Sequence, residues 1–477
     1  MSAKSSLNSE ENKTTRAQRW LTCPQCGQAY ETEQFFCKKC HYYSPGWGTY
    51  DEIGRRARIR RRILIIVSIV LILLVSYTIW ISRDYIPNPL LLLAEPASHI
   101  NSSPLDGEWT NFGHDLTNSR YVKEGKKITG RVAWSVNLGP FTDSAPAIKD
   151  ETLYLGGHFK IYAIKTKTGE IVWEIETTGP VSTSPAIAGE FVFFGLLDGR
   201  VLALERSTGK SVWEFKTGNY VFGSPIVVDG ILYIGSGDKK IHALDAATGA
   251  VIWNYQTGGS IPFSPVIVDG ILYIASGDRT LYSLDAKTGA LRLNFRSVWA
   301  FKDSPAMSND FVYYVSTKGN LNSIRHGVSD FPGSHFLRQV WTEFWLWRFP
   351  VPFPPHQPGS TWRISPTEKK QKFVSSPAIA PGRLYLGDTS GRFYALDPEK
   401  GETIWTFKTG VPISKSPLVV GNTVYFGTKS GDFYSLHRDT ADLKWKLSLH
   451  SPLAAKPTFG DGQIFLRTEN GLLHAID

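Results

Sequence analysis

The chain has 477 residues, of which 42% are hydrophobic and 13% aromatic, with 43 glycines and two methionines. This composition favours an all-β repeat fold over a helical one. The net charge is +9, but residues 1–62 hold 12 Lys/Arg against 6 Asp/Glu, beside an apolar segment. That placement argues against a nucleic-acid partner. All four cysteines lie between positions 23 and 40, which excludes disulfides and thiol chemistry elsewhere in the chain.

We expect residues 1–20 to be disordered and residues 21–45 to form a small metal domain. The motif CPQCGQAYETEQFFCKKC contains two CxxC turns separated by ten residues. Two such turns present four thiolates, which complete a tetrahedral zinc site. So short a stretch cannot bury a sufficient core, and a metal would stabilise it. The predicted ligands are Cys23, Cys26, Cys37 and Cys40.

This cysteine pattern resembles the short zinc ribbons at the N-termini of many prokaryotic membrane proteins. The resemblance implies a closed site with a structural zinc ion rather than a catalytic one. A redox pair or free thiols are the alternatives, and His41 is a competing ligand directly after the last cysteine.

Residues 63–81 read ILIIVSIVLILLVSYTIWI and carry no charge. Nineteen such residues can cross a bilayer as a helix. A core helix would show a polar face, and a signal peptide would begin near residue 1. The preceding basic segment, residues 46–62, carries six arginines, whereas only Arg83 follows closely. The positive-inside rule therefore predicts a single-pass, uncleaved anchor with a cytoplasmic N-terminus, and places the rest of the chain outside the cytoplasm.

After a Pro- and Leu-rich linker, residues 82–108, the chain is built from repeats of about 40 residues. One unit reads SPIVVDGILYIGSGDKKIHALDAATGAVIWNYQTG, from residue 224 to residue 258. Each unit predicts four strands separated by Asp-Gly, Gly/Ser/Asp and Thr-Gly turns. Four strands in 40 residues is the spacing of a β-propeller blade. Eight units follow from the leading prolines, Pro146, Pro185, Pro225, Pro265, Pro305, Pro377, Pro417 and Pro457.

The predicted fold is an all-β, eight-bladed propeller over residues 109–477, closed by an N-terminal strand. Residues 131–138 read as a fourth strand without the other three, and residues 473–477 as a third strand without a fourth. Pairing them closes the ring and removes a free edge. A tryptophan in the fourth strand is expected to pack on the neighbouring blade; Leu293 replaces it in unit four and unit five lacks it. The predicted blade-docking tryptophans are Trp134, Trp173, Trp213, Trp253, Trp405 and Trp445.

The repeats resemble the PQQ-like β-propeller repeats of bacterial quinoproteins. Their signature A-L-D-x-x-T-G-x-x-x-W stands here as ALDAATGAVIW, and residues 109–122, WTNFGHDLTNSRYV, are similar to that family's lead-in. Enzymes of the family hold PQQ with calcium, through vicinal cysteines and ligands on sizeable inserts. Because this propeller has no cysteine and mostly minimal units, the resemblance is nearer to the non-enzymatic, BamB-like members, and it implies protein binding without PQQ and without catalysis.

Two surfaces are candidates for binding. The first is a rim of aromatic and basic side chains on one propeller face. The alternative is that the rings plug the channel and the cations are solvated turn residues. The predicted rim residues are Tyr220, Phe222, Phe263, Trp299, Phe301, Lys160, Arg200, Lys240 and Arg392.

The second surface is an insertion in unit five, residues 327–372, which leaves from a third-to-fourth strand turn. It is either a flap over its own blade or a contact with a partner or a membrane interface, where Trp beside Arg is favoured. The membrane tether enters the ring on the same face, so we hypothesise that the insertion touches the membrane. Its candidate contact residues are Trp341, Phe344, Trp345, Trp347 and Phe349.

These observations predict a cell-membrane protein with a cytoplasmic zinc ribbon and an extracytoplasmic scaffold that binds other envelope proteins. The first alternative is a PQQ-dependent quinoprotein dehydrogenase. The second is a sensor whose propeller binds a ligand, although one short span transmits such a signal poorly without dimerisation.

Overall fold

The structure, a computed structural model, describes residues 20–477 except 24, 32–36, 38, 42–49, 94–95, 106–107, 141, 309, 353–356 and 367–370. Residues 1–19 of the segment predicted to be disordered therefore lie outside the described residues. The chain divides into two units, Met1–Ile81 and Ser82–Asp477.

The first unit contains a short hairpin and most of a long helix. Strands β1 (Trp20–Thr22) and β2 (Ala29–Glu31) pair antiparallel. Helix α1 (Tyr50–Ser82) contains the candidate span Arg58–Trp80, whose most apolar 18-residue window has a mean hydropathy of 2.8 and no burial. At about 1.5 Å per residue, this stretch exceeds the roughly 30 Å of a bilayer's hydrocarbon core. The prediction of one candidate transmembrane helix is confirmed.

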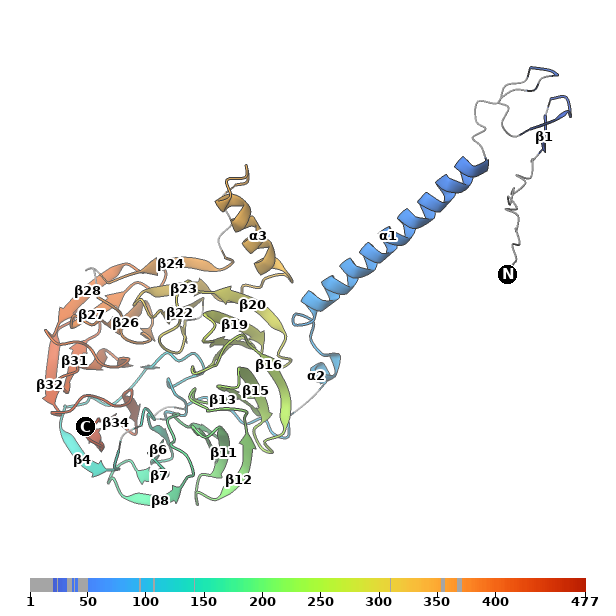
Figure 1. The fold of residues 1–477 in the computed structure, drawn as a ribbon. Helices are drawn as coiled ribbons and strands as arrows, with labels where there is room; N and C mark the ends of the chain where they lie inside the picture. The colour runs from blue at the N-terminus through green and yellow to red at the C-terminus, as the bar shows by residue number, and fades with distance from the viewer. Residues whose placement is uncertain are drawn as a thin grey trace, which may run out of the picture. The chain divides into compact units, whose positions relative to one another are not determined.

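The second unit begins with helix α2 (Pro89–Leu93) and strand β3 (Tyr121–Val122), followed by eight blades (Figure 1). Blade 1 has β5 (Ala147–Lys149), β6 (Thr152–Gly156), β7 (Lys160–Lys165) and β8 (Ile171–Glu176). Blade 2 has β9 (Ala186–Ala188), β10 (Phe191–Gly195), β11 (Arg200–Glu205) and β12 (Ser211–Lys216). Blade 3 has β13 (Ile226–Val228), β14 (Ile231–Gly235), β15 (Lys240–Asp245) and β16 (Val251–Gln256). Blade 4 has β17 (Val266–Val268), β18 (Ile271–Ala275), β19 (Thr280–Asp285) and β20 (Leu291–Arg296).

The insertion lies in blade 5, which has β21 (Ala306–Met307), β22 (Phe311–Val315), β23 (Leu321–Arg325), then helix α3 (Ser334–Leu346) and β24 (Ser360–Ile364). Blade 6 has β25 (Ala378–Ala380), β26 (Arg383–Gly387), β27 (Arg392–Leu396) and β28 (Thr403–Lys408). Blade 7 has β29 (Leu418–Val420), β30 (Thr423–Gly427), β31 (Asp432–His437) and β32 (Leu443–Ser448), and β3 joins it beside β29. Blade 8 has β33 (Thr458–Gly460), β34 (Gln463–Arg467), β35 (Leu472–Ile476) and β4 (Val132–Asn137).

The ring closes in blade 8 as the sequence predicts. Strand β4, from the beginning of the propeller, pairs antiparallel with β35, and Ala475 lies opposite Trp134. The backbone amides of Thr129 and Gly130 also donate to the carbonyl of Asp477, at 2.8 and 2.9 Å. Strand β4 thus takes the place of the fourth strand that residues 473–477 require, and it removes the free edge of β35.

Burial explains the sequence pattern of each blade. The second strand, such as β14 with sequence ILYIG, is buried at every position because neighbouring blades cover both of its faces. It therefore reads as a continuous apolar run. The fourth strand is the outermost, and in β12 exposed positions alternate with half-buried ones. The core consequently lies between blades rather than in one central cluster.

Fourth-strand tryptophans join each blade to the next. The indole Nε1 donates at 2.8–3.0 Å to a backbone carbonyl that shortly precedes the fourth strand of the next blade, in the pairs Trp134–Thr166, Trp173–Arg206, Trp213–Ala246, Trp253–Ala286, Trp405–Arg438 and Trp445–Ile128. The Thr-Gly turn is required for this contact. Gly249 has a φ of 74°, and a Cβ added there would lie 2.8 Å from the Trp213 ring.

One expectation about these tryptophans is wrong. Unit five does not lack its tryptophan, because Trp362 in β24 occupies the docking position, and a Cβ added at Gly401 of blade 6 would lie 2.8 Å from its ring. The insertion separates Trp362 from the leading proline of its unit and so hides it from the repeat spacing. Leu293, buried in blade 4, replaces the tryptophan there as predicted.

The segment that we call the lead-in here, residues 100–122 except 106–107, contains the predicted lead-in residues 109–122 and crosses the inside of the ring. The backbone N–H two residues after the leading proline of a blade donates to the lead-in at 2.7–3.0 Å, in the pairs Ile148–Trp109, Ile187–Thr110, Val227–Ser102, Ile267–Leu116, Met307–Thr117, Ile379–Ser119 and Val419–Arg120. These bonds satisfy inner-strand amides that would otherwise face the channel. Gly230 and Gly421, in first-to-second strand turns, also donate to Ile100 and Val122, so the lead-in closes the channel on that side.

Candidate functional site

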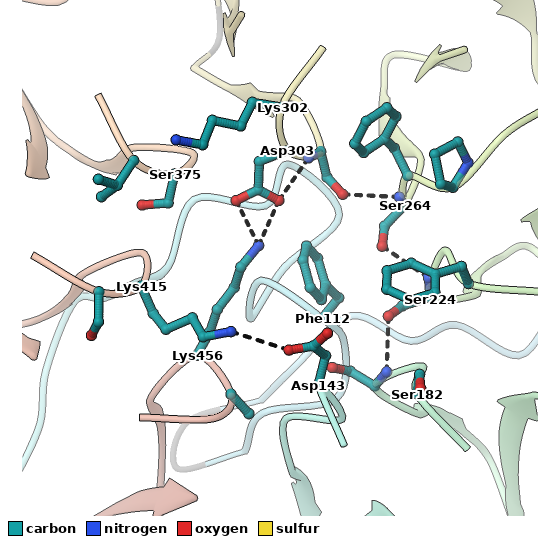
Figure 2. Close-up of a pocket in the computed structure, with 18 residues that line it drawn as sticks. Phe112, Asp143, Ser182, Ser224, Ser264, Lys302, Asp303, Ser375, Lys415 and Lys456 are labelled. Atoms are coloured by element: carbon teal, nitrogen blue, oxygen red, sulfur yellow. Dashed lines mark hydrogen bonds and ion pairs between the residues drawn. The ribbon is translucent and has the colours of Figure 1, made fainter. Parts of the chain in front are cut away.

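A pocket of about 300 Å³ occupies the opposite end of the channel (Figure 2). Its walls are the residues that precede each inner strand, and Phe112 of the lead-in forms part of its lining. The 40-residue repeat places equivalent positions of the blades at the same level along the channel axis. One short stretch from each of several blades therefore contributes to one site. We call this end of the channel the open mouth.

Serine residues link the pocket walls around half of the ring. The backbone N–H of Ser184 donates to the hydroxyl of Ser224, Ser224 to Ser264, and Ser264 to Ser304, each at 2.9 Å. The series ends at Asp303, whose carboxylate accepts from the backbone amides of Ser304 and Ser376, at 2.8 and 3.0 Å. These bonds hold the walls of the pocket in a fixed arrangement.

A buried charge cluster joins the pocket to the lead-in. Lys456 Nζ lies 2.7 and 2.9 Å from the two carboxylate oxygens of Asp303, and Figure 2 shows the lysine pointing at that carboxylate. The Phe112 ring lies 4.1 Å from Lys456 Nζ and 5.1 Å from the Arg120 guanidinium carbon. This arrangement places two cations and one carboxylate around a single aromatic ring.

The charges in this cluster depend on one another. Burial by itself raises the pKa of a carboxyl group, but the positive charges of Lys456 and Arg120 and the Ser376 amide lower the pKa of Asp303 below its usual range. Burial lowers the pKa of Lys456, and the attraction of Asp303 opposes that effect. Asp303 is therefore the carboxylate that keeps two buried cations compensated.

The solvent side of the pocket carries further lysines. Lys415 Nζ lies 3.1 Å from the carboxylate of Asp143, and both side chains are partly exposed. Lys302 donates to the carbonyl of Phe373 at 3.2 Å. Burial and the neighbouring charges of Lys372 and Lys429 lower the pKa of Lys302. The open mouth is therefore basic along blades 5 to 7.

The aromatic residues predicted for the rim have different environments. Phe222 and Phe263 line the pocket. Tyr220 and Trp299 are exposed, and the ammonium of Lys318 lies 4.6 Å from the centre of the Trp299 ring. Phe301 is 5% exposed and packs between Phe263 and Tyr314, so it does not contribute to an exposed surface.

The basic residues predicted for the rim lie away from the pocket walls. Lys160 is 2.7 Å from Glu174, and Arg200 is 2.8 Å from Asp198. The other two are the exposed Lys240 and the half-buried Arg392. The structure therefore does not bring these four residues together with the aromatic lining of the pocket.

The aromatic residues predicted for the insertion all remain exposed. Trp341, Phe344 and Trp345 lie on α3, while Trp347 and Phe349 follow its end, and their exposed fractions run from 41% to 75%. Trp341 Nε1 donates to the carbonyl of Pro352 at 2.9 Å. These side chains do not form the buried underside that a flap over blade 5 would require.

The four predicted metal ligands come together at the N-terminus. The Sγ atoms of Cys23, Cys26, Cys37 and Cys40 lie within 4.8 Å of one another. Cys23 and Cys40 are 3.5 Å apart, and Cys26 and Cys37 are 3.6 Å apart. Zinc–sulfur bonds of about 2.3 Å in a tetrahedron place sulfurs about 3.8 Å apart, so the cluster fits that ion. Backbone amides, chiefly that of Cys40, lower the pKa of Cys37 to about 6.

The sequence interpretation missed the residues at the centre of the pocket. Six units have serine directly before the leading proline, whereas unit eight has Lys456 there. Asp303 stands one position earlier in unit five, where other units have small or uncharged residues or Lys415. These two departures from the repeat were the sequence features that could have indicated the pocket residues. No feature of the lead-in sequence indicated that Phe112 would line a pocket.

Comparisons with known proteins agree with this architecture of PQQ-like repeats. A family profile described as "Outer membrane protein assembly factor BamB" matches residues 120–261, 256–327, 346–445 and 389–477. Together these matches cover more than half of the chain. The chain belongs to this family. No curated protein sequence matches it significantly.

Solved structures of a BamB and of dehydrogenases share the fold. BamB from Moraxella catarrhalis is 16% identical, with a TM-score of 0.55 over 73% of this chain and 97% of that one. The quinohemoprotein alcohol dehydrogenase from Comamonas testosteroni is 17% identical, with a TM-score of 0.62 over 79% and 81%. A europium-containing methanol dehydrogenase is 16% identical, with a TM-score of 0.60 over 80% and 91%. At these identities the likeness concerns the fold alone.

Proposed function

We propose that this chain is a membrane-anchored envelope protein whose propeller lies outside the cytoplasm and binds a partner protein through the open mouth. The observation that carries the proposal is the contrast between the two ends of the channel. The lead-in occupies one end, whereas the other retains a pocket with Phe222 exposed at its wall. Exposed aromatic side chains around a pocket are common anchors of protein interfaces.

The chemistry of the mouth favours an acidic partner segment. Burial lowers the pKa of Lys302, and repulsion from the positive charges of Lys372 and Lys429 lowers it further. A carboxylate from a partner would relieve that repulsion. Phe222 and Phe263 would contact the apolar part of the same segment. The printed description of the family concerns outer-membrane protein assembly, and an envelope partner is in keeping with that context.

The N-terminal unit has a separate role in this proposal. The arginines that precede the uncharged residues 63–81 favour a cytoplasmic N-terminus. A cytoplasmic cluster of four cysteines holds a structural zinc ion, because four thiolates leave no open coordination position. In intact cells, a membrane-impermeant thiol reagent should then spare the native cysteines even after zinc is chelated, yet modify a cysteine introduced at Val212. Modification of the native cysteines under those conditions would contradict the topology.

The pocket supports binding better than it supports quinone chemistry. Its two lining carboxylates, Asp143 and Asp303, each pair with a lysine, and no amide side chain is among its described lining residues. A calcium ion held with PQQ needs oxygen ligands that are free to bind it. Adding PQQ and calcium to the purified chain should therefore give no bound chromophore and no alcohol-dependent dye reduction.

Site-specific photo-crosslinking tests the binding surface. A photoreactive phenylalanine at Phe222 of the full-length chain in native membranes should form one dominant protein adduct. The same residue at Val212, which is exposed on the outer strand of blade 2, is the matched control. An adduct at Phe222 that excess of a synthetic acidic peptide abolishes supports the proposal. Equal adducts at both positions, or none at Phe222, would refute it.

A further inference from the structure

The chain contacts the propeller almost immediately after its candidate span. The apolar stretch of α1 ends at Trp80, and the carbonyl of Asp84 accepts from the backbone amide of Leu291 at 2.6 Å. Tyr85 and Leu91 then pack against the core cluster between blades 3 and 4. Four residue steps span at most about 14 Å. The beginning of β20 is therefore tied closely to the point where the chain leaves the apolar stretch.

The insertion begins at the next residue of the same strand. The backbone amide of Asp330 donates to the carbonyl of Arg292 at 2.7 Å. At the other end of the insertion, the side-chain amide of Gln357 exchanges two hydrogen bonds with the backbone of Arg296, at 2.6 and 2.8 Å. The outer edge of β20 thus holds the juxtamembrane chain at its first residue and the insertion at its second and last residues.

An ion pair fixes α3 to this base. Arg338 Nη2 lies 2.6 Å from the carboxylate of Asp330, whose side chain is 1% exposed. Burial alone would raise the pKa of Asp330, but hydrogen bonds from Arg338 and Ser334 lower it. Burial and the charge of Asp330 raise the pKa of Tyr85, so the juxtamembrane tyrosine lies within electrostatic range of this pair. Helix α3 is therefore anchored beside the membrane tether.

Helix α3 and the residues after it expose eight large apolar side chains, which together we call the aromatic surface. Thirteen residues make a helix about 20 Å long, and Figure 1 shows α3 projecting from the rim of the ring. A water-exposed surface of this kind indicates a binding site. Arg348 lies within it, and Trp beside Arg is typical of lipid headgroup depth. The aromatic surface consists of Phe336, Leu337, Trp341, Phe344, Trp345, Leu346, Trp347 and Phe349.

We propose that the aromatic surface lies in the interface of the same bilayer that α1 crosses. The bilayer is the expected contact because of how the chain is attached. Asp84 binds Leu291 and the base of the insertion binds the next residue, Arg292, so the aromatic surface stays near the membrane that α1 crosses. The propeller is then attached at two points, by α1 and by α3, which restricts its rotation and keeps one orientation toward the bilayer. This inference rests on α1 spanning a membrane, and it is independent of the partner at the open mouth.

Photo-crosslinking to lipid tests the contact in the full-length chain. The chain is reconstituted into liposomes of phosphatidylethanolamine and phosphatidylglycerol with a photoreactive phenylalanine at Trp347, the most exposed of the five predicted contact aromatics. Irradiation followed by mass spectrometry counts phospholipid adducts on the peptide. We expect at least about tenfold more adducts at Trp347 than at Val212 of blade 2.

Two further measurements keep the result interpretable. Phe349 is a second labelling site if the chain labelled at Trp347 does not fold, as judged by its thermal unfolding. Labelling at Phe222, on the open mouth, should give as few lipid adducts as Val212. Equal lipid adducts at Trp347, Phe349 and Val212 would overturn the proposal, as would adducts at Trp347 only to a protein. Neither outcome would affect the crosslink expected at Phe222 to a partner.

Discussion

The two ends of the propeller channel differ in what satisfies their polar groups. At one end the lead-in accepts hydrogen bonds from the inner strands of seven blades. At the open mouth, Lys415 and Asp143 pair across the pocket while partly exposed to water. The same repeats build both ends of the channel. The difference between the ends therefore comes from the lead-in, which precedes the repeats in the sequence.

This difference separates residues that stabilise the fold from residues available to a partner. A buried ion pair that loses one member leaves an uncompensated charge in a low-dielectric environment. An exposed pair loses little, because water replaces the missing partner. Asp303 and Asp143, both paired with a lysine in the same pocket, therefore allow a direct test.

The largest expected effect is that of Asp303→Asn. The substitution leaves Lys456 and Arg120 buried without their carboxylate, and breaking such a cluster costs about 3–5 kcal/mol. Denaturant unfolding of the full-length chain in detergent would measure the loss. Asp143→Asn is the matched control and should cost no more than about 1 kcal/mol. Equal losses would contradict the distinction between the buried and the partly exposed ion pair of the pocket.

The same pair of variants gives a pH test. The folded-state pKa of Asp303 is lowered, so its contribution to stability is present above its unfolded pKa of about 3.9. That contribution is lost as the pH falls through the folded pKa. The Asp303→Asn variant lacks this acid-dependent loss, so its stability difference from the unsubstituted chain should shrink as the pH falls below about 4. A difference that stays constant with pH would mean that Asp303 is not charged in the fold.

The sequence predicted the blades but not this charge cluster, and the reason is physical. The sequence signals for strands, turns and ring closure are local or recur with the repeat, so comparing eight similar units reveals them. Asp303 and Lys456 are 153 positions apart, and only the closed ring brings them together. Trp362 was missed because the insertion breaks the period. Lys456 at the serine position and Asp303 one position before it were visible as departures from the repeat, but their meaning depended on Phe112 and Arg120, which lie outside the repeats.

The next prediction concerns the docking of one blade on its neighbour, on the side of the ring that the lead-in closes. Gly249→Ala forces a positive φ on alanine and places its Cβ against the Trp213 ring, so a loss of about 2–4 kcal/mol is expected. Gly270→Ala is the control, since Gly270 has a φ of 70° with no atom within 4 Å of an added Cβ. It should cost about 1–2 kcal/mol. Thermal unfolding of both variants separates backbone strain from the clash with the tryptophan.

The third prediction isolates the hydrogen bond of the docking tryptophan. Trp213→Phe loses the bond from Nε1 to the carbonyl of Ala246, worth about 1 kcal/mol, in addition to apolar contact. Trp362→Phe loses similar contact, but its Nε1 has no partner among the described residues. The Trp213 variant should therefore be the less stable of the two by about 1 kcal/mol in denaturant unfolding. Equal losses of stability would assign the docking energy to packing alone.

The smallest effect on stability is expected at the open mouth, where function is the better readout. Lys415→Met removes the partly exposed pair with Asp143, so stability should change by less than about 1 kcal/mol. If an acidic segment binds there, the variant should bind more weakly, and the salt dependence of its binding should decrease because one interfacial cation is lost. Crosslink yield at Phe222, measured at low and high salt, tests both. A stable variant with unchanged yield and salt dependence would place the partner away from this mouth, while a destabilised one would make Lys415 part of the fold, as Lys456 is.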